Sequence, residues 1–161
     1  MIFITVGTEH PFDRLIKAVD HWAATHGRHD FYAQIGHGAW KPHFIPFVEM
    51  MTHAELLEYL QSAELIISHA GMGTILSAMK YRKKIIVLPK KEKLGEHRND
   101  HQMATCRRLQ NHLGLNVAFD ESDVLRMLEY SHLLLNPEFN LKHSHELLSD
   151  RIRNFILDHG N

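Results

Sequence analysis

The feature that most constrains this chain is an apolar segment that runs into a glycine-rich turn and then into a helical segment, over residues 64–79. Residues 65–68 predict a buried strand, and the turn that follows contains Gly71 and Gly73. Glycine lets the backbone approach a ligand closely and adopt positive φ without strain. The first amides of a helix beginning near Thr74 would lack internal partners and would carry the positive end of the helix dipole. This arrangement predicts a site for a phosphate or diphosphate group.

The glycine turn alone is not specific, because many α/β proteins use glycines only to pack a tight turn between strand and helix. It differs from the dinucleotide fingerprint, since Leu76 stands where the third glycine or alanine would be. It is not a Walker loop, because no G-K-S or G-K-T follows. A second apolar strand, residues 85–88, ends at Pro89 and leads into a polar loop, residues 90–99. Two strand ends therefore offer polar groups to one site.

The alternation of strand and helix patterns predicts a single doubly wound, Rossmann-like α/β domain with a parallel sheet. In such folds, ligands bind outside the carboxyl ends of the strands. Pro46 places the third strand at a sheet edge, and Ser122 is positioned to cap the last helix of the domain. We expect strands at residues 1–6, 31–35, 44–48, 65–68, 85–88 and 116–119, and helices at residues 12–24, 54–63, 100–112 and 122–135, besides the helix after the glycine turn.

The length and charge of the chain limit its class. Its 161 residues suit one globular domain, and a formal net charge of -1 argues against nucleic-acid binding driven by bulk charge. The single cysteine, Cys106, excludes an internal disulfide and fits a reducing compartment. No segment has the length and apolarity of a membrane span or a signal peptide, so we expect a cytoplasmic location.

The C-terminal part of the sequence has a different pattern. Asn136-Pro137 predicts a short hinge, and residues 144–159 carry apolar residues along one helical stripe. This amphipathic helix would either pack back on its own domain or dock on another subunit, and the pattern leaves both open. We therefore divide the chain into an α/β domain, residues 1–135, and a hinge with a terminal helix, residues 136–161.

Three motifs, in order within this frame, resemble the C-terminal domain of glycosyltransferase family 28. They are I-T-V-G-T at residues 4–8 followed by P-F-D-R-L-I at 11–16, I-S-H-A-G-M-G-T at 67–74, and Pro89 with G-E-H-R-N-D-H-Q at 95–102. The resemblance extends over residues 1–119 and implies the C-terminal half of a GT-B transferase. It is strongest to small stand-alone subunits: PssE-type subunits of bacterial exopolysaccharide or capsule synthesis, and the catalytic subunit of the eukaryotic dolichyl-diphosphate N-acetylglucosamine transferase.

The resemblance implies the donor-binding catalytic subunit of an inverting glycosyltransferase in polysaccharide synthesis. This chain would bind a UDP-sugar, and a membrane-associated partner subunit would bind the lipid-diphosphate-linked saccharide acceptor. The partner would bring the chain to the inner face of the membrane. The size agrees, because an active site between two doubly wound domains needs a second domain. We expect no metal and no other cofactor, since the sequence has no D-x-D triplet to bridge a metal to the diphosphate.

The resemblance also implies roles for individual residues. The donor diphosphate would face Gly71, Met72, Gly73 and Thr74, with Ser68 and His69 at the preceding strand end and Gly7 and Thr8 in the first loop. Asp100, His101 and Gln102 resemble the element that holds the hydroxyls of the donor sugar, and Glu96 resembles a glutamate that grips the ribose. From the residues alone, Asp100 would equally serve as a helix N-cap.

Inverting transfer needs a base that accepts the proton of the attacking hydroxyl. Glu9 and His10, in the loop after the first strand, would lie at the same sheet edge, and we assign them to catalysis together with Asp100. A residue of the partner is the alternative base. His97 and His101 have the spacing of a metal-binding pair, but His97 precedes the predicted helix, so we predict no metal site.

Two other functions stay open at this stage. The chain would also suit a non-catalytic nucleotide-sugar-binding module that stabilises or regulates its partner. A fragment of a nucleotide-sugar epimerase is the third possibility, because sugar 2-epimerases share the two-domain architecture. The sequence does not identify the sugar, since the residues that would distinguish one hexose from another lie in variable loops.

Overall fold

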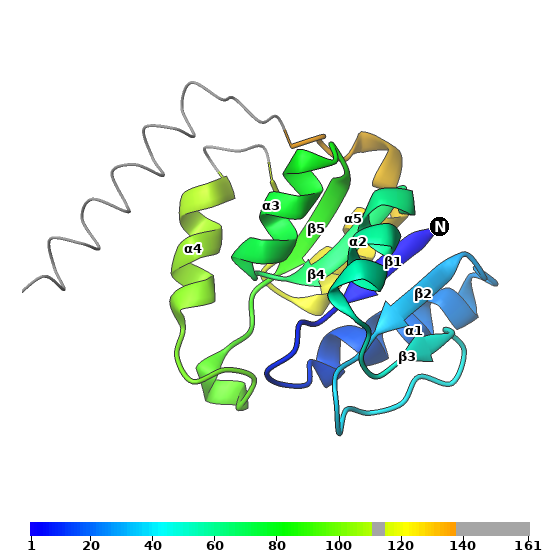
Figure 1. The fold of residues 1–161 in the computed structure, drawn as a ribbon, viewed down its shortest axis with the longest axis horizontal. Helices are drawn as coiled ribbons and strands as arrows, with labels where there is room; N and C mark the ends of the chain where they lie inside the picture. The colour runs from blue at the N-terminus through cyan, green and yellow to red at the C-terminus, as the bar shows by residue number, and fades with distance from the viewer. Residues whose placement is uncertain (111–114, 138–161) are drawn as a thin grey trace, which may run out of the picture.

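A computed structural model describes residues 1–110 and 115–137, and these form a six-stranded sheet in the order β3-β2-β1-β4-β5-β6 (Figure 1). Every neighbouring pair of strands is parallel. The predicted third strand lies at the sheet edge, as Pro46 indicated. The strands are β1 (Ile2–Thr5), β2 (Phe31–Gln34), β3 (Phe47–Val48), β4 (Leu65–His69), β5 (Lys84–Leu88) and β6 (Asn116–Val117).

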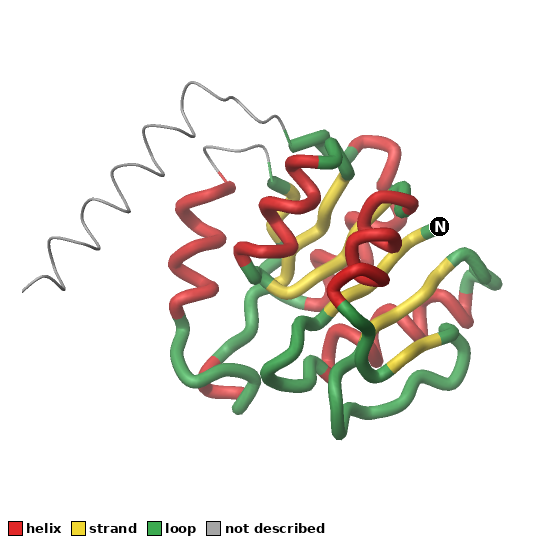
Figure 2. The backbone as a smooth tube through the Cα atoms, in the orientation of Figure 1, coloured by secondary structure: helices red, strands yellow, loops and turns green. Residues whose placement is uncertain are grey.

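Helices cover both faces of the sheet, with α1 and α5 on one face and α2, α3 and α4 on the other (Figures 1 and 2). The helices are α1 (Asp13–Thr25), α2 (His53–Ser62), α3 (Met72–Lys80), α4 (His101–Gln110) and α5 (Glu121–Glu129), with the short 3-10 helices η1 (Glu92–Leu94) and η2 (Ser131–Leu133). The predicted doubly wound α/β class is therefore confirmed.

Alternate residues of the central strands serve two separate cores. Ile4 and Ile67 pack toward α1 and α5, whereas Phe3 and Ile66 pack toward the helices on the opposite face. All four side chains are fully buried. A parallel sheet covered on both faces requires apolar residues at successive positions, which explains the continuous apolar runs in the sequence. Cys106 lies in the second core, where burial raises the pKa of its thiol to about 12, so it takes no part in chemistry.

The sheet reverses its winding direction between β1 and β4. From β1 the chain builds β2 and β3 on one side, and it then returns to place β4 on the other side of β1. Thr5 is in register with Ser68, so the carboxyl ends of these two strands lie next to each other. In doubly wound folds this reversal opens a crevice at the carboxyl edge, and ligands bind there.

Three details of the predicted helices are wrong. Helix α5 is capped by Asp120, whose Oδ1 accepts a hydrogen bond of 2.8 Å from the amide of Asp123, and not by Ser122. This helix ends at Glu129 and does not continue to residue 135, because η2 follows it. Helix α3 begins at Met72 with Gly71 as its N-cap, earlier than the predicted start near Thr74.

Residues 130–137 return along the amino edge of the sheet. Leu135 and Asn116 exchange two hydrogen bonds of 3.0 Å, one to each polar atom of the Asn116 amide. The chain is thus held to β6 directly before the predicted hinge at Asn136-Pro137. The predicted amphipathic helix, residues 144–159, lies outside the described residues. Within the described ranges, no helix combines the length and the apolar character needed to cross a membrane.

Candidate functional site

Three loops meet at the carboxyl edge of the sheet, and the site residues predicted from the sequence lie in these loops or at the strand and helix ends beside them. The β1–α1 loop spans residues 6–12, the β4–α3 turn residues 70–71, and the β5–α4 loop residues 89–100. Hydrogen bonds link the loops to one another: Gln102 joins the second and third loops, and Lys90 joins the third to the first. Hydrogen bonds therefore hold the three loops at this edge together.

His69, the last residue of β4, fills the space between two glycines. A Cβ atom added to Gly7 would lie 2.7 Å from the imidazole Cε1, and one added to Gly71 would overlap Nε2. Gly7 also has a φ of 79°, which favours glycine for a second reason. The ring thus sits between the β1–α1 loop and the β4–α3 turn, at the reversal point of the sheet.

The imidazole of His69 is neutral at ordinary pH. Its Nδ1 is fully buried and has no hydrogen-bond partner among the described residues. Burial lowers the pKa of His69 to about 4, with a further contribution from the positive charge of Lys90. A neutral imidazole both donates and accepts a hydrogen bond, so the ring offers a polar contact to a ligand without adding charge.

The N-terminus of α3 is free of side-chain caps, because Gly71 has no side chain. Its first amides and the positive end of the helix dipole therefore remain available to an anion. Neither Gly71 nor Gly73 adopts positive φ, so the expected conformational reason for these glycines is wrong. Gly71 makes room for His69, whereas a Cβ at Gly73 would meet nothing within 4 Å and would project into open space.

The other predicted diphosphate-binding residues differ in how exposed they are. Ser68 is fully buried, and its hydroxyl donates a 2.8 Å hydrogen bond to the His69 carbonyl, so it faces the fold. Met72 packs against the core beneath α3. Thr74 is half-buried, and Thr8 in the first loop is exposed. Of this set, Thr74 and Thr8 are the residues whose hydroxyls are open to a ligand.

Gln102, in the first turn of α4, is buried and holds two loops. Its Oε1 accepts hydrogen bonds from the amides of Ala70 at 3.2 Å and Lys90 at 3.1 Å. The side-chain oxygen is therefore occupied by backbone. Its Nε2 makes no hydrogen bond within the described part of the chain.

Glu96 forms the centre of a network with α1. Arg14 Nε donates to Glu96 Oε1 at 2.6 Å, and the amide of Lys91 donates to Glu96 Oε2 at 2.9 Å. Arg14 also donates to the carbonyl of Pro89 at 2.8 Å and lies 3.3 Å from a carboxylate oxygen of Glu121. Both oxygens of Glu96 are thus engaged in fixing the β5–α4 loop.

Asp100 precedes α4, and its backbone carbonyl accepts the amides of Met103 and Ala104. Its carboxylate accepts a 2.8 Å hydrogen bond from the amide of Glu92, so the charge anchors η1 rather than the first turn of its own helix. Asp100 is exposed, and His101 beside it is hydrogen-bonded through Nδ1 to Asn99. Asp100 and His101 lie at the outer side of the site.

The two predicted base residues in the first loop differ in their surroundings. Glu9 is exposed, and its carboxylate lies 3.9 Å from Nε2 of His97. The rings of His10 and His97 approach edge to face with centroids 6.2 Å apart, and those of His97 and His101 with centroids 4.6 Å apart. His97 lies in the loop before α4, as expected. Among the described residues, no group of histidine, cysteine and carboxylate side chains has the arrangement of a metal site.

Arg14, Gln34 and Lys90 hold the loops in place, and the sequence did not predict this role for any of them. Arg14 fixes the β5–α4 loop, and Gln34 donates from Nε2 to the carbonyl of Gly7 at 3.1 Å, which holds the first loop. Lys90 is only 2% exposed, and its ammonium donates to the carbonyl of Val6 at 3.0 Å and to that of His10 at 2.5 Å. A polar residue at the end of a buried strand is the one signal that the sequence gives for Gln34 and Lys90.

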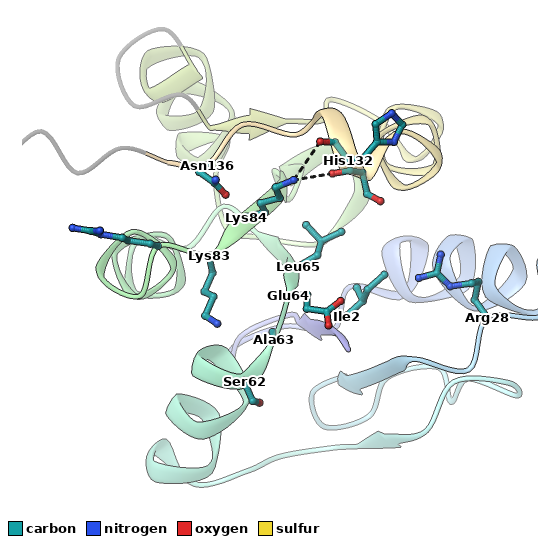
Figure 3. Close-up of a pocket in the computed structure, with 12 residues that line it drawn as sticks. Ile2, Arg28, Ser62, Ala63, Glu64, Leu65, Lys83, Lys84, His132 and Asn136 are labelled. Carbon is teal, nitrogen blue, oxygen red and sulfur yellow. Dashed lines mark hydrogen bonds between the residues drawn. The ribbon is translucent and has the colours of Figure 1, made fainter.

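A cavity of about 520 Å³ lies at the opposite edge of the sheet, near the amino ends of β1, β4 and β5 (Figure 3). Ile2, Leu65 and Lys84 line it, and the Lys84 ammonium donates to the carbonyls of Ser131 and His132 at 3.3 and 3.4 Å. None of the predicted site residues lines this cavity. Because parallel α/β folds bind ligands at the carboxyl ends, we place the functional site at the other edge.

Comparison with protein families identifies the family of this domain. The model of the glycosyltransferase family 28 C-terminal domain matches residues 1–144. The chain belongs to this family. The matched range contains every residue of the three loops, so the site described above is part of a glycosyltransferase family 28 C-terminal domain. No curated protein matches the chain significantly.

Solved structures support the fold of this family 28 domain. A structure titled as the glycotransferase of kitacinnamycin matches with a TM-score of 0.58 at 15% identity, over 80% of this chain and 34% of that one. The solution NMR structure of ALG13 matches with a TM-score of 0.56 at 18% identity, over 84% of this chain and 87% of that one. The chain therefore spans about a third of the first protein and most of the second.

Proposed function

We propose that this family 28 domain is the donor-binding catalytic subunit of an inverting glycosyltransferase that uses a UDP-sugar. The observation that carries the proposal is the convergence of the uncapped α3 N-terminus, the imidazole of His69 and the buried ammonium of Lys90 at the reversal point of the sheet. Helix N-termini and cations are the groups that bind phosphates without a metal. We therefore propose that the donor diphosphate binds here without a metal ion.

The acceptor would be a lipid-diphosphate-linked saccharide in polysaccharide synthesis, held by a membrane-associated partner subunit. The support is that a GT-B active site lies between two domains, whereas the described residues form one sheet. The exposed loop with Glu9 and His10 would face the acceptor, and one of them, or a group of the partner, would accept the hydroxyl proton. Through this partner the chain would act at the cytoplasmic face of the membrane.

A second candidate is a non-catalytic nucleotide-sugar-binding module that stabilises its partner. One observation favours it: the carboxylates of Glu96 and Asp100 and the oxygen of Gln102 are all engaged in hydrogen bonds within the chain. In this case the loops would bind the nucleotide, and the partner would supply every reacting group.

Co-expression with the product of a neighbouring gene tests both candidates. The complex is assayed with a panel of UDP-sugars and membrane lipid acceptor, and the stereochemistry of the product is determined. Asp100→Asn and Glu9→Gln are compared with Glu58→Gln, which is exposed on α2 and away from the site. Loss of transfer in a site variant, with the complex intact, supports the catalytic subunit. Unchanged transfer in both site variants would support the binding module.

A further inference from the structure

We propose that Lys90 supplies the positive charge that balances the diphosphate of the donor, from a buried position at the reversal point of the sheet. This proposal rests on the proposed function, because it requires a nucleotide diphosphate to bind at this edge. It deepens that function by naming the residue that takes the place of a metal ion.

The placement of Lys90 is unusual for a residue that follows β5. Its side chain reaches across the end of β4 to the β1–α1 loop, where the ammonium donates to the carbonyls of Val6 and His10. Because β4 lies between β1 and β5 in the sheet, the side chain of Lys90 crosses the end of β4, and its ammonium lies beside the β1–α1 loop, 5.6 Å from the centre of the Phe12 ring. His69, the last residue of β4, and the first turn of α3 lie at the same edge of the sheet.

The ammonium of Lys90 has no carboxylate in direct contact among the described residues. Both of its acceptors are neutral carbonyls, so one of its three N–H donors has no hydrogen-bond acceptor among the described residues. The carboxylate that influences it most, Glu96, is bonded to Arg14 and to the amide of Lys91. Taking a charge out of water costs several kcal/mol when no opposite charge accompanies it. An anionic ligand in the crevice would provide that opposite charge.

A second observation points to the same place. Burial lowers the pKa of Lys90 to about 8, although Glu96 and Glu9 act in the opposite direction. His69, which lies at the same edge of the sheet, stays neutral partly because of the Lys90 charge. The fixed ammonium and the uncapped α3 N-terminus thus contribute positive potential to one edge of the sheet, and the low exposure of Lys90 strengthens its contribution.

The role in the reaction is electrostatic. The acceptor oxygen forms a bond to the anomeric carbon, and the bond from that carbon to the diphosphate oxygen breaks. The bonding electron pair stays on the departing diphosphate, and the hydroxyl proton goes to the base. Lys90 transfers no proton, and its charge stabilises the leaving group as negative charge develops on it.

The test compares Lys90→Met, which removes the charge and keeps much of the length, with Lys93→Met, an exposed residue of η1 in the same loop. UDP binding to the complex is measured by calorimetry at pH 7.5, and folding is checked by circular dichroism. We expect Lys90→Met to raise the Kd for UDP roughly tenfold or more, since hydrogen bonds to charged groups contribute about 1.5–3 kcal/mol. Lys93→Met should change it less than about twofold.

A pH series separates charge from a purely mechanical role of Lys90 in holding the loop. UDP affinity of Lys93→Met should fall between pH 7.5 and 9.5 more steeply than that of Lys90→Met. The facing groups Glu9, Glu96, His10, His69 and His97 are the same in both variants, and the titration of UDP itself is also common to both. Lys90→Arg keeps its charge over this pH range, so its UDP affinity should not show the steeper fall.

The outcomes are distinguishable. Unchanged UDP affinity in folded Lys90→Met overturns the role of Lys90 and leaves the proposed function intact. Equal pH profiles in Lys90→Met and Lys93→Met overturn it as well, because the side chain would then act only by holding the loop. If Lys90→Met does not fold, the profiles of wild type and Lys90→Arg decide. Absence of UDP binding by the wild-type complex contradicts the proposed function itself.

Discussion

The imidazole of His69 occupies the volume that a side chain at Gly71 would need. Gly71 has a φ of -83°, which any residue adopts, but a Cβ at this position would overlap Nε2 of the ring. The same ring also lies against Gly7 in the neighbouring loop. The requirement for glycine at residue 71 is therefore set by a side chain two positions earlier, and not by the geometry of the turn.

This relationship predicts opposite effects for two alanine substitutions in one turn. Gly71→Ala should displace the imidazole and destabilise the fold by about 1–3 kcal/mol, the usual cost of overpacking. Gly73→Ala, with open space around its Cβ, should leave stability unchanged or raise it by up to about 1 kcal/mol, because alanine favours the helix. Urea denaturation of the two variants measures the difference.

Gly73→Ala should weaken ligand binding, although it should not weaken the fold. If a diphosphate approaches the α3 amides, a methyl group at residue 73 would project into its space, and the Kd for UDP should rise at least roughly tenfold. Leu76→Ala, on the exposed side of the same helix, serves as the control for indirect effects. A Gly73→Ala protein that binds UDP as tightly as wild type would exclude this turn as the diphosphate site.

The order of elements and the edge that carries the site could be predicted because they depend on periodicity and on strand ends. Continuous apolar runs such as residues 65–68 are required in a strand covered on both faces, so they identify β4 without ambiguity. Helix ends were less predictable. Asp120 and Ser122 are both good N-cap residues, and the choice between them depends on where β6 ends and the chain turns.

The second prediction concerns Gln102, whose Oε1 accepts two backbone amides. Gln102→Leu would leave the amides of Ala70 and Lys90 buried without partners, and each such loss costs about 1–3 kcal/mol. We expect a fall in stability of about 2–4 kcal/mol, measured by urea denaturation. Gln102→Glu keeps an acceptor oxygen and should retain most of the stability.

The same pair of variants separates structure from sugar recognition. Gln102→Glu replaces the Nε2 donor by an oxygen, so a lost contact to a sugar hydroxyl would appear as weaker UDP-sugar binding with UDP binding unchanged. Equal losses for UDP and UDP-sugar would instead assign Gln102 to the support of the two loops. Loss of transfer in Gln102→Leu alone does not distinguish these roles.

The third prediction concerns the ion pair of Arg14 and Glu96, whose side chains are 13% and 10% exposed. Glu96→Gln would leave the guanidinium largely buried with a weaker partner, and we expect a loss of about 2–3 kcal/mol. Asp30→Asn breaks the pair of Arg28 and Asp30, which has similar hydrogen bonds but is 45% and 39% exposed, and should cost less than about 1 kcal/mol. Similar losses in both variants would contradict the structural role of Glu96.

The loop-holding role of these residues could not be predicted, because their partners are distant in the sequence and most of them are backbone atoms. Lys90 contacts carbonyls 80 and 84 residues away, and Arg14 contacts Glu96 across 82 residues. No local pattern records such contacts. For the same reason, the sequence suggested Glu96 and Gln102 as ligand contacts, whereas much of their hydrogen-bonding capacity is used to fix the loops that surround the site.

The last prediction follows from the lowered pKa of His69. Its value of about 4 in the folded protein lies below the usual 6.5, so the unfolded chain binds a proton at this residue first as the pH falls. The contribution of a neutral His69 to stability is fully present above about pH 6.5 and is lost as the pH falls toward 4. At that limit the loss is of order 2–3 kcal/mol.

Two measurements test the direction of this pH dependence. The imidazole resonances of His69 in a 15N-labelled protein should show a neutral ring at pH 5.5. Urea denaturation at pH 7.5 and 4.5 should show a smaller acid destabilisation in His69→Gln than in wild type, because glutamine does not titrate. The change in His29→Gln, at an exposed position, gives the baseline. A His69 ring that protonates near pH 6.5 would show that the imidazole is not held between the two glycines as described.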